Sequence, residues 1–225
     1  MRILITGATG TIGRALAQQL VQLDSAVDLI LLGRREDSLA ALDDGLQARG
    51  ARPSLLVPLD FSTANAAHCK ELAQKLEPEG LDALALTAAM FTGLHPLDHL
   101  KPVDFDRILR VGLYGPYWLL HHMLPLLKQS QRGCVLGVSD DVGAQGKAFW
   151  GAYGMAKSGF DTMLEQLRAE AEGRLQVRRV VPPPVGSPIR GLVYPGEDPR
   201  SLPPAAEVVQ PWAEWLLASM GPQTG

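Results

Sequence analysis

The stretch "ILITGATGTIGRAL", residues 3–16, decides how the rest of the chain is expected to fold. It begins as an apolar strand, passes through Gly7, Gly10 and Gly13, and continues as an amphipathic helix. Glycine lets the backbone turn tightly and approach a pyrophosphate, and the helix that follows offers free amide groups to an anion. A glycine triad between a strand and a helix predicts a dinucleotide-binding turn; the alternative is a plain glycine-rich connection.

Short apolar runs alternate with helix-period segments along the whole chain. The runs are continuous rather than alternating, as expected of parallel strands that are covered on both faces. This pattern predicts one α/β domain over residues 1–225, a doubly wound Rossmann fold with a parallel sheet of six or seven strands. We expect strands at residues 2–6, 27–32, 54–59, 83–87, 134–139 and 176–181, and helices at residues 11–23, 37–49, 64–76, 103–129, 150–172 and 205–219. Pro125 is expected to end or bend the fourth helix.

Composition and charge argue against several classes of function. The net charge is −3, and no basic run of the kind that follows a phosphate backbone occurs, so we expect no nucleic-acid partner. Cys69 and Cys134 lack C-x-x-C spacing, and no apolar run is long enough to cross a bilayer. His95 and His99 have the i, i+4 spacing of a metal pair, but Pro96 lies between them. We expect a cytoplasmic protein with no membrane partner and no metal.

Residues 182–204, "PPPVGSPIRGLVYPGEDPRSLPP", differ from the rest of the chain. The density of proline predicts neither strand nor regular helix. The segment is long for a connection inside a domain, and loops of this length are often lids or binding loops. We expect a substrate loop; the alternative is a rigid surface crossover.

Tyr153 and Lys157, in "GAYGMAK" (residues 151–157), lie four residues apart and share one face of a helix. A free phenol has a pKa of about 10 and exchanges its proton reluctantly near neutrality. A nearby ammonium stabilises the phenolate and should lower that pKa. The pair predicts a site of proton transfer; the alternative is a surface tyrosine beside a solvated lysine.

The end of the second expected strand, "LLGRRED" (residues 31–37), bears on the choice of dinucleotide. Folds that prefer NAD usually place an acidic residue there, but this chain has Gly33 followed by Arg34 and Arg35. A guanidinium can hold a 2′-phosphate through paired hydrogen bonds. We expect NADP(H) to be favoured over NAD(H). The alternative is that both arginines begin a solvated helix, where Glu36 and Asp37 partly neutralise them.

Several motifs in order resemble the short-chain dehydrogenase/reductase family. "TGATGTIG" (6–13) resembles its glycine turn, "LDF" (59–61) its aspartate that contacts the adenine, "DALALTAAM" (82–90) its NNAG strand end and "GAYGMAK" its Tyr-x-x-x-Lys pair. The segment around "GKAFWGAYGMAK", with the later "YPGEDPRSLPP", resembles one subgroup of bacterial oxidoreductases of this family.

The resemblance implies hydride transfer between NADP(H) and a small carbonyl or alcohol substrate. Tyr153 would be the acid/base, and Lys157 would tune it and hold the nicotinamide ribose. Family members are commonly homodimers or homotetramers, here through the apolar faces of residues 103–127 and 160–167. The coenzyme contacts that the resemblance implies are Gly7, Thr9, Gly10, Thr11, Ile12, Gly13, Arg34, Arg35, Asp60, Phe61, Thr87, Ala88, Ala89, Tyr153 and Lys157.

Asp140 stands where the family usually has its catalytic serine. Ser139 is its neighbour, but adjacent side chains of an extended segment point to opposite faces, so Ser139 takes over only if the segment is a loop. An ionised Asp140 accepts hydrogen bonds only and repels an alkoxide, whereas a protonated one donates. Two further readings are a substrate whose own cation or donor meets Asp140, and a pair of solvated turn aspartates formed with Asp141.

Other departures from the family pattern accompany Asp140. The helix asparagine that helps connect the lysine to water aligns with Gly112, the NNAG turn becomes residues 86–89, and Pro184 removes an amide after the sixth expected strand. Family members usually continue beyond "GPQTG" (221–225) into another strand, so we expect one strand fewer or another cover for that edge.

Two hypotheses follow. The first is an NADP(H)-dependent carbonyl reductase or alcohol dehydrogenase with an altered active site, supported by the intact Tyr153 and Lys157. The second is a dinucleotide-binding regulator or interaction protein with little or no turnover, supported by the departures.

Overall fold

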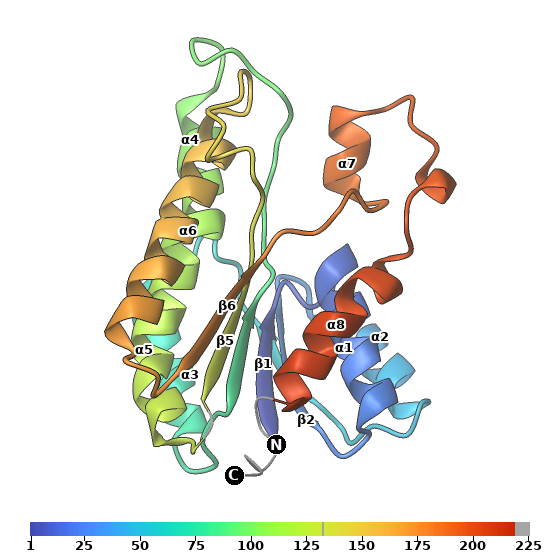
Figure 1. Cartoon of the computed structure of the whole chain (residues 1–225), viewed down its shortest axis with the longest axis vertical. Helices are drawn as coiled ribbons and strands as arrows, with labels where there is room; N and C mark the ends of the chain where they lie inside the picture. Colours follow the sequence, from blue (N-terminus) through green and yellow to red (C-terminus); the bar gives the residue numbers. More distant parts are fainter. Residues whose placement is uncertain (132, 219–225) are drawn as a thin grey trace.

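The computed structural model describes residues 1–131 and 133–218. Within them, one parallel sheet holds six strands in the order β3-β2-β1-β4-β5-β6, which confirms the doubly wound fold. Figure 1 shows the strands running side by side, with the amino end of β1 at the bottom of the view. The strands are β1 (Arg2–Thr6), β2 (Asp28–Gly33), β3 (Leu55–Pro58), β4 (Ala83–Leu86), β5 (Cys134–Val138) and β6 (Gln176–Val180).

Helices cover both faces of the sheet, as the continuous apolar strands require (Figure 1). One face carries α1 (Thr11–Leu23), α2 (Glu36–Gln47) and α8 (Ala205–Ala218). The other carries α3 (Ala66–Leu76), α4 (Pro102–Leu109), α5 (Gly115–Gln129) and α6 (Gly151–Glu170). Along β1, Ile3 and Ile5 pack toward the first layer, and Leu4 packs toward the second. No helix in the described ranges is long and apolar enough to cross a membrane.

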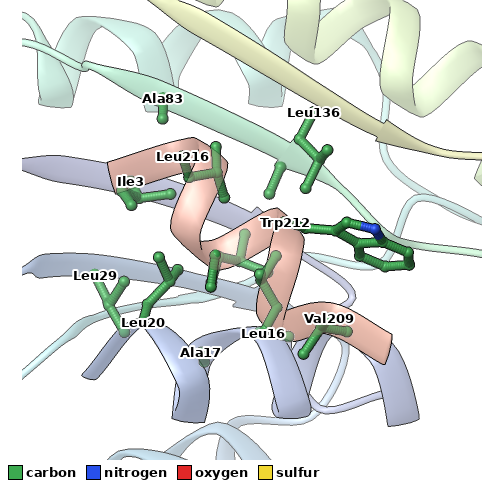
Figure 2. Packing of buried hydrophobic residues seen from close by; sticks show 14 of the residues in the cluster. Ile3, Leu16, Ala17, Leu20, Leu29, Ala83, Leu136, Val209, Trp212 and Leu216 are labelled. Atoms are coloured by element: carbon green, nitrogen blue, oxygen red, sulfur yellow. The ribbon is translucent and has the colours of Figure 1, made fainter. Parts of the chain in front are cut away.

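Helix α8 closes the first face. Its Val209, Trp212 and Leu216 pack against α1 and the middle of the sheet (Figure 2). The fully buried Leu16 and Leu20 of α1 lie in the same cluster. The helix expected at 205–219 is thus present through Ala218, while Ser219 and the segment 221–225 lie outside the described residues.

The helix expected at 103–129 is continuous but not uniform. A π-helical turn, Arg110–Tyr114, joins α4 to α5. At Gly112, inside this turn, an added Cβ would lie 2.9 Å from the Cβ of Ala156, so glycine lets α6 approach closely. Pro125 does not end the helix, which runs on to Gln129.

The expectation that residues 182–204 contain no regular helix is wrong. A short helix, α7 (Pro188–Val193), and a 3₁₀ turn, Pro199–Ser201, form within them. The Ser187 hydroxyl accepts a hydrogen bond from the Arg190 amide at 3.1 Å, and Pro188 occupies the first turn, where its missing amide donor costs nothing. Figure 1 shows α7 beyond the carboxyl ends of the strands, apart from both helix layers.

Candidate functional site

All candidate residues line one cleft of about 800 Å³. It lies at the carboxyl ends of the parallel strands, where doubly wound folds bind ligands, and α7 forms one of its walls. The sequence-predicted residues that it brings together are Gly7, Thr9, Gly10, Thr11, Ile12, Gly13, Arg34, Arg35, Asp60, Phe61, Thr87, Ala88, Ala89, Ser139, Asp140, Tyr153 and Lys157.

The glycine turn between β1 and α1 leaves no room for side chains at two positions. Gly7 has a φ of +60°, and a Cβ there would lie 2.8 Å from the Cα of Ala88. A Cβ on Gly13 would lie 2.4 Å from the carbonyl oxygen of Gly7 and 2.8 Å from Oγ1 of Thr87. The turn therefore packs directly against the end of β4, and the first amides of α1 face the cleft.

Substitution of Gly13 by alanine should lower the free energy of unfolding by about 1–3 kcal/mol, the usual range for overpacking. The control is Gly45→Ala on α2, where a Cβ meets no atom within 4 Å and should be neutral or slightly stabilising. Urea unfolding of both variants measures the difference. Equal stability of Gly13→Ala and wild type would contradict the packing described above.

The turn after β4, which differs from the family's NNAG sequence, is hydrogen-bonded to Thr6 at the end of β1. The Thr6 hydroxyl accepts hydrogen bonds from the amides of Thr87 at 3.1 Å and Ala88 at 3.2 Å, and Thr87 Oγ1 donates to the Thr6 carbonyl oxygen. Thr6 is completely buried. These bonds fix the strand end that replaces the NNAG sequence and keep its backbone at the edge of the cleft.

At the far end of the cleft, Arg34 and Arg35 are exposed at the start of α2. Neither forms an ion pair with any residue in the described ranges, so both guanidinium groups are available to an anion. At Gly33, an added Cβ would lie 3.1 Å from Leu39, which leaves little space for the acidic side chain typical of NAD sites.

Asp60 and Phe61 follow β3 along the same cleft. Asp60 Oδ1 accepts a hydrogen bond from the Ser62 amide at 2.8 Å, which fixes a tight turn. Phe61 is buried, and its ring fills the space that a Cβ on Gly115 would need. Asp60 stands at the cleft wall, whereas Phe61 also belongs to the core.

Lys157 is buried beneath Tyr153 on α6. Its Nζ donates a hydrogen bond to the carbonyl oxygen of Val138 at 2.9 Å and lies 5.7 Å from the centre of the Tyr153 ring. Burial lowers the pKa of the amine to about 8, against the opposing charges of Asp140 and Asp161. The helical spacing thus brings both side chains to the same place, as predicted.

The Tyr153 hydroxyl donates a hydrogen bond to Oδ2 of Asp140 at 3.2 Å. Burial raises the pKa of Tyr153 above that of a free phenol, and the charge of Asp140 and this hydrogen bond raise it further. The pKa of Tyr153 therefore shifts in the direction opposite to the one expected from Lys157 alone. Burial of the phenol and the facing Asp140 carboxylate outweigh the effect of the amine.

Asp140, not Ser139, faces the phenol. Strand β5 ends at Val138, so both residues lie in the loop that follows it. Asp140 Oδ1 accepts the Val142 amide at 3.1 Å, which fixes the carboxylate. Ser139 is buried, and its hydroxyl has no hydrogen-bond partner among the described residues. The interpretation of Asp140 as a purely solvated turn residue does not fit these contacts.

The neighbouring Asp141 points elsewhere. Its carboxylate pairs with Arg179 of β6 at 3.1 Å, and the same guanidinium pairs with Asp161 of α6 at 2.8 Å. Arg179 thus ties the loop after β5 to the helix that carries Tyr153 and Lys157.

Sequence reasoning missed the aromatic residues around the phenol. The ring centres of Phe91 and Trp150 lie 5.4 Å and 5.6 Å from that of Tyr153. Ile189 and Val193 of α7 pack against this group. Trp150 stands three residues before Tyr153, so helical spacing could have placed it there, but the loop residue Phe91 carries no such signal.

Arg190 in α7 was also missed as a structural residue. Its Nε and one terminal nitrogen donate to the two carboxylate oxygens of Glu197 at 2.6 Å and 2.7 Å, and its guanidinium lies 3.8 Å from the centre of the Tyr194 ring. This paired interaction links the two halves of the proline-rich segment 182–204 beside the cleft.

Comparison with known proteins gives consistent results. The short chain dehydrogenase family model matches residues 1–198. The uncharacterized oxidoreductase YciK of Escherichia coli is 30% identical over 217 residues, which cover 96% of this chain and 85% of that protein. Solved structures of similar shape include a short chain dehydrogenase from Shigella flexneri complexed with NADP, with a TM-score of 0.90 and 29% identity over 99% of this chain and 92% of that one. Another, from Escherichia coli and complexed with NADPH, has a TM-score of 0.90 and 29% identity over 99% of this chain and 91% of that one. The chain therefore belongs to the short-chain dehydrogenase family of oxidoreductases.

Proposed function

We propose that this protein is an NADP(H)-dependent oxidoreductase that interconverts a carbonyl and an alcohol, with Tyr153 as the acid/base. The observation that carries the proposal is the convergence of the Tyr153 hydroxyl and the Lys157 amine in the same cleft as the glycine turn. Two structural neighbours of the same family are complexed with NADP or NADPH, which supports the choice of coenzyme.

The residues of the cleft fit NADP(H). The turn at Gly7 and Gly13 has no space for side chains and presents backbone amides to a pyrophosphate. Arg34 and Arg35 would hold the 2′-phosphate, because an exposed guanidinium without a carboxylate partner can form paired hydrogen bonds with it. Thr87, Ala88 and Ala89 would line the middle of the coenzyme, and Asp60 with Phe61 would flank the adenine.

In the proposed mechanism the bound coenzyme supplies or accepts the hydride. Tyr153 exchanges a proton with the substrate oxygen, so its hydroxyl turns from Asp140 toward the carbonyl during reduction. Lys157 stands beneath the ring, where a positive charge favours the phenolate. Phe91, Trp150 and the apolar side of α7 exclude water from the reacting atoms.

A second candidate function is a dinucleotide-binding regulator with little turnover. The hydrogen bond from Tyr153 to Asp140 favours it, because the phenolic proton is already committed to a carboxylate. The raised pKa of Tyr153 acts in the same direction, since phenolate forms less readily.

Steady-state oxidation of NADPH by a panel of carbonyl compounds distinguishes the two functions. The panel contains 4-nitrobenzaldehyde, ethyl acetoacetate and cyclohexanone, and NADH serves as the matched coenzyme control. We expect carbonyl-dependent consumption with NADPH preferred over NADH. A protein that binds NADPH but turns over none of these compounds, nor their alcohols with NADP, would support the regulator instead.

Self-association is expected through α5 rather than through residues 160–167. Phe160, Leu164 and Leu167 pack in the core of the chain itself, so that part of the expected interface is unavailable. Tyr117 on α5 and Tyr114, which directly precedes that helix, are exposed. We propose that a second copy covers them in a homodimer or homotetramer.

Tyr117→Glu should shift the protein to monomer, because a buried, unpaired carboxylate is costly at an apolar interface. Analytical ultracentrifugation measures the mass, and Gln129→Glu, exposed near the end of the same helix, is the matched control. A monomeric wild type, or an unchanged Tyr117→Glu oligomer, would count against this interface.

A further inference from the structure

Two departures from the family pattern, Asp140 and Gly112, lie next to the segment that carries Tyr153 and Lys157. Asp140 contacts the Tyr153 hydroxyl, and Gly112 packs against Ala156, next to Lys157. The structure allows one explanation for both.

We propose that the proton exchanged in the reaction reaches solvent through Asp140, and that this exit replaces the one that an asparagine at position 112 would provide on the side of Lys157. This inference rests on the proposed function and names the proton path of the same site.

The path past Gly112 is blocked by packing. Lys157 is buried, and its Nζ donates a hydrogen bond to the Val138 carbonyl oxygen. The ring of Phe160 lies 5.4 Å from the same nitrogen. Gly112 contributes no polar side chain, and Ala156 occupies the space where a Cβ would begin. Gly112 therefore offers no side-chain group that could continue a chain of hydrogen bonds from Lys157 on this side.

The path on the side of Asp140 is open and already hydrogen-bonded. Tyr153 donates to Oδ2, while the Val142 amide holds Oδ1 and keeps the carboxylate in place. Asp140 is half-buried and the next residue, Asp141, is exposed, so a proton that reaches Oδ2 lies one step from water. The Tyr153 hydroxyl already donates its hydrogen to Asp140, so the phenol oxygen can accept the proton of a substrate alcohol.

The transfer balances in alcohol oxidation. The substrate O–H bond breaks and its proton bonds to Tyr153 Oη, while the phenolic proton moves to Asp140 Oδ2 and then to water. The C–H electron pair leaves as hydride to NADP, the oxidant of the proposed function. Tyr153 is neutral before and after the step, so no free phenolate has to form despite its raised pKa.

The charges around this path are arranged consistently. Asp140 contacts the Tyr153 hydroxyl, and the charges of Asp140 and Asp161 both raise the pKa of the Lys157 amine against the effect of burial. Arg179 pairs with Asp141 and Asp161, and Asp140 forms no ion pair within residues 1–131 and 133–218.

The transfer of a proton from Tyr153 through Asp140 to water is called the relay below. Asp140→Asn tests it, because asparagine keeps an acceptor oxygen for Tyr153 but cannot take up a proton. With NADP and the alcohols of the carbonyl panel (4-nitrobenzyl alcohol, ethyl 3-hydroxybutyrate and cyclohexanol), we expect kcat to fall by about 10²-fold. Added imidazole, a small proton carrier, should restore most of the rate in a saturating manner. Asp44→Asn removes the same charge at an exposed position of α2, outside the cleft, and should retain the wild-type rate.

Three results would overturn the relay while leaving the proposed function intact. Asp140→Asn could be as active as wild type, or its lost activity could fail to respond to imidazole, which would mean that Asp140 only orients the phenol. Asp140→Ser, which restores the usual family hydroxyl, could be faster than wild type. Loss of the proposed function is recognised separately, by equal rates for wild type and Tyr153→Phe.

A spectroscopic titration provides a readout that does not depend on turnover. The phenolate absorbance of Tyr153, isolated by subtracting the Tyr153→Phe spectrum, should move to lower pH in Asp140→Asn. The reason is that the charge of Asp140 and its hydrogen bond raise the pKa of Tyr153 in addition to burial. An unmoved titration would show that the contact on which the relay depends is missing.

Discussion

Tyr153→Phe should lower kcat for carbonyl reduction by about 10²- to 10⁴-fold, the range that a positioned proton donor contributes. The hydroxyl is the group within hydrogen-bond distance of Asp140, and phenylalanine removes it while keeping the ring packed against Phe91 and Trp150. The fold and the proposed coenzyme-binding part of the cleft should therefore persist, because neither depends on the hydroxyl.

Single-turnover reduction at saturating NADPH measures this effect without interference from product release. NADPH affinity and thermal unfolding of the variant serve as controls for an intact site. Equal residual rates for Tyr153→Phe and wild type would remove Tyr153 from the mechanism and favour the regulator.

Arg34→Ala should weaken NADPH binding by about 10- to 100-fold, because a hydrogen bond to a charged group contributes roughly 1.5–3 kcal/mol. NADH affinity should change little, since NADH has no 2′-phosphate. The basis is the exposed guanidinium beside Gly33, where an acidic side chain has little space.

Fluorescence titration with each coenzyme measures the ratio of the two affinities. Arg49→Ala, an exposed arginine beyond the other end of α2, removes the same charge at a distance and should leave the ratio unchanged. If Arg34→Ala retains the wild-type preference while Arg35→Ala loses it, the phosphate contact belongs to Arg35. If neither variant changes the preference, the arginine explanation is wrong.

The parts of the fold that depend on local sequence could be predicted. The glycine turn and the six strands follow from apolar runs and glycine positions, and the spacing of Tyr153 and Lys157 is a property of any helix. For that reason the residues expected at the site converge in one cleft.

The parts that depend on contacts between distant segments could not be predicted. The need for glycine at position 112 depends on Ala156 of another helix, and the raised pKa of Tyr153 depends on its burial and on the loop that carries Asp140. Helix α7 is an intermediate case. Ser187 followed by Pro188 is a recognisable helix start, but the many prolines around it indicated an irregular segment instead.

The central claim is that a phenol and an amine stand beside a bound nicotinamide, and its most direct test is the titration of wild-type protein with NADPH. Trp150 lines the cleft next to Tyr153, so bound NADPH should emit when tryptophan is excited. We predict saturable binding of one NADPH per chain, with weaker energy transfer in Trp150→Phe. Absence of binding by NADPH, NADP, NADH and NAD alike would contradict the account.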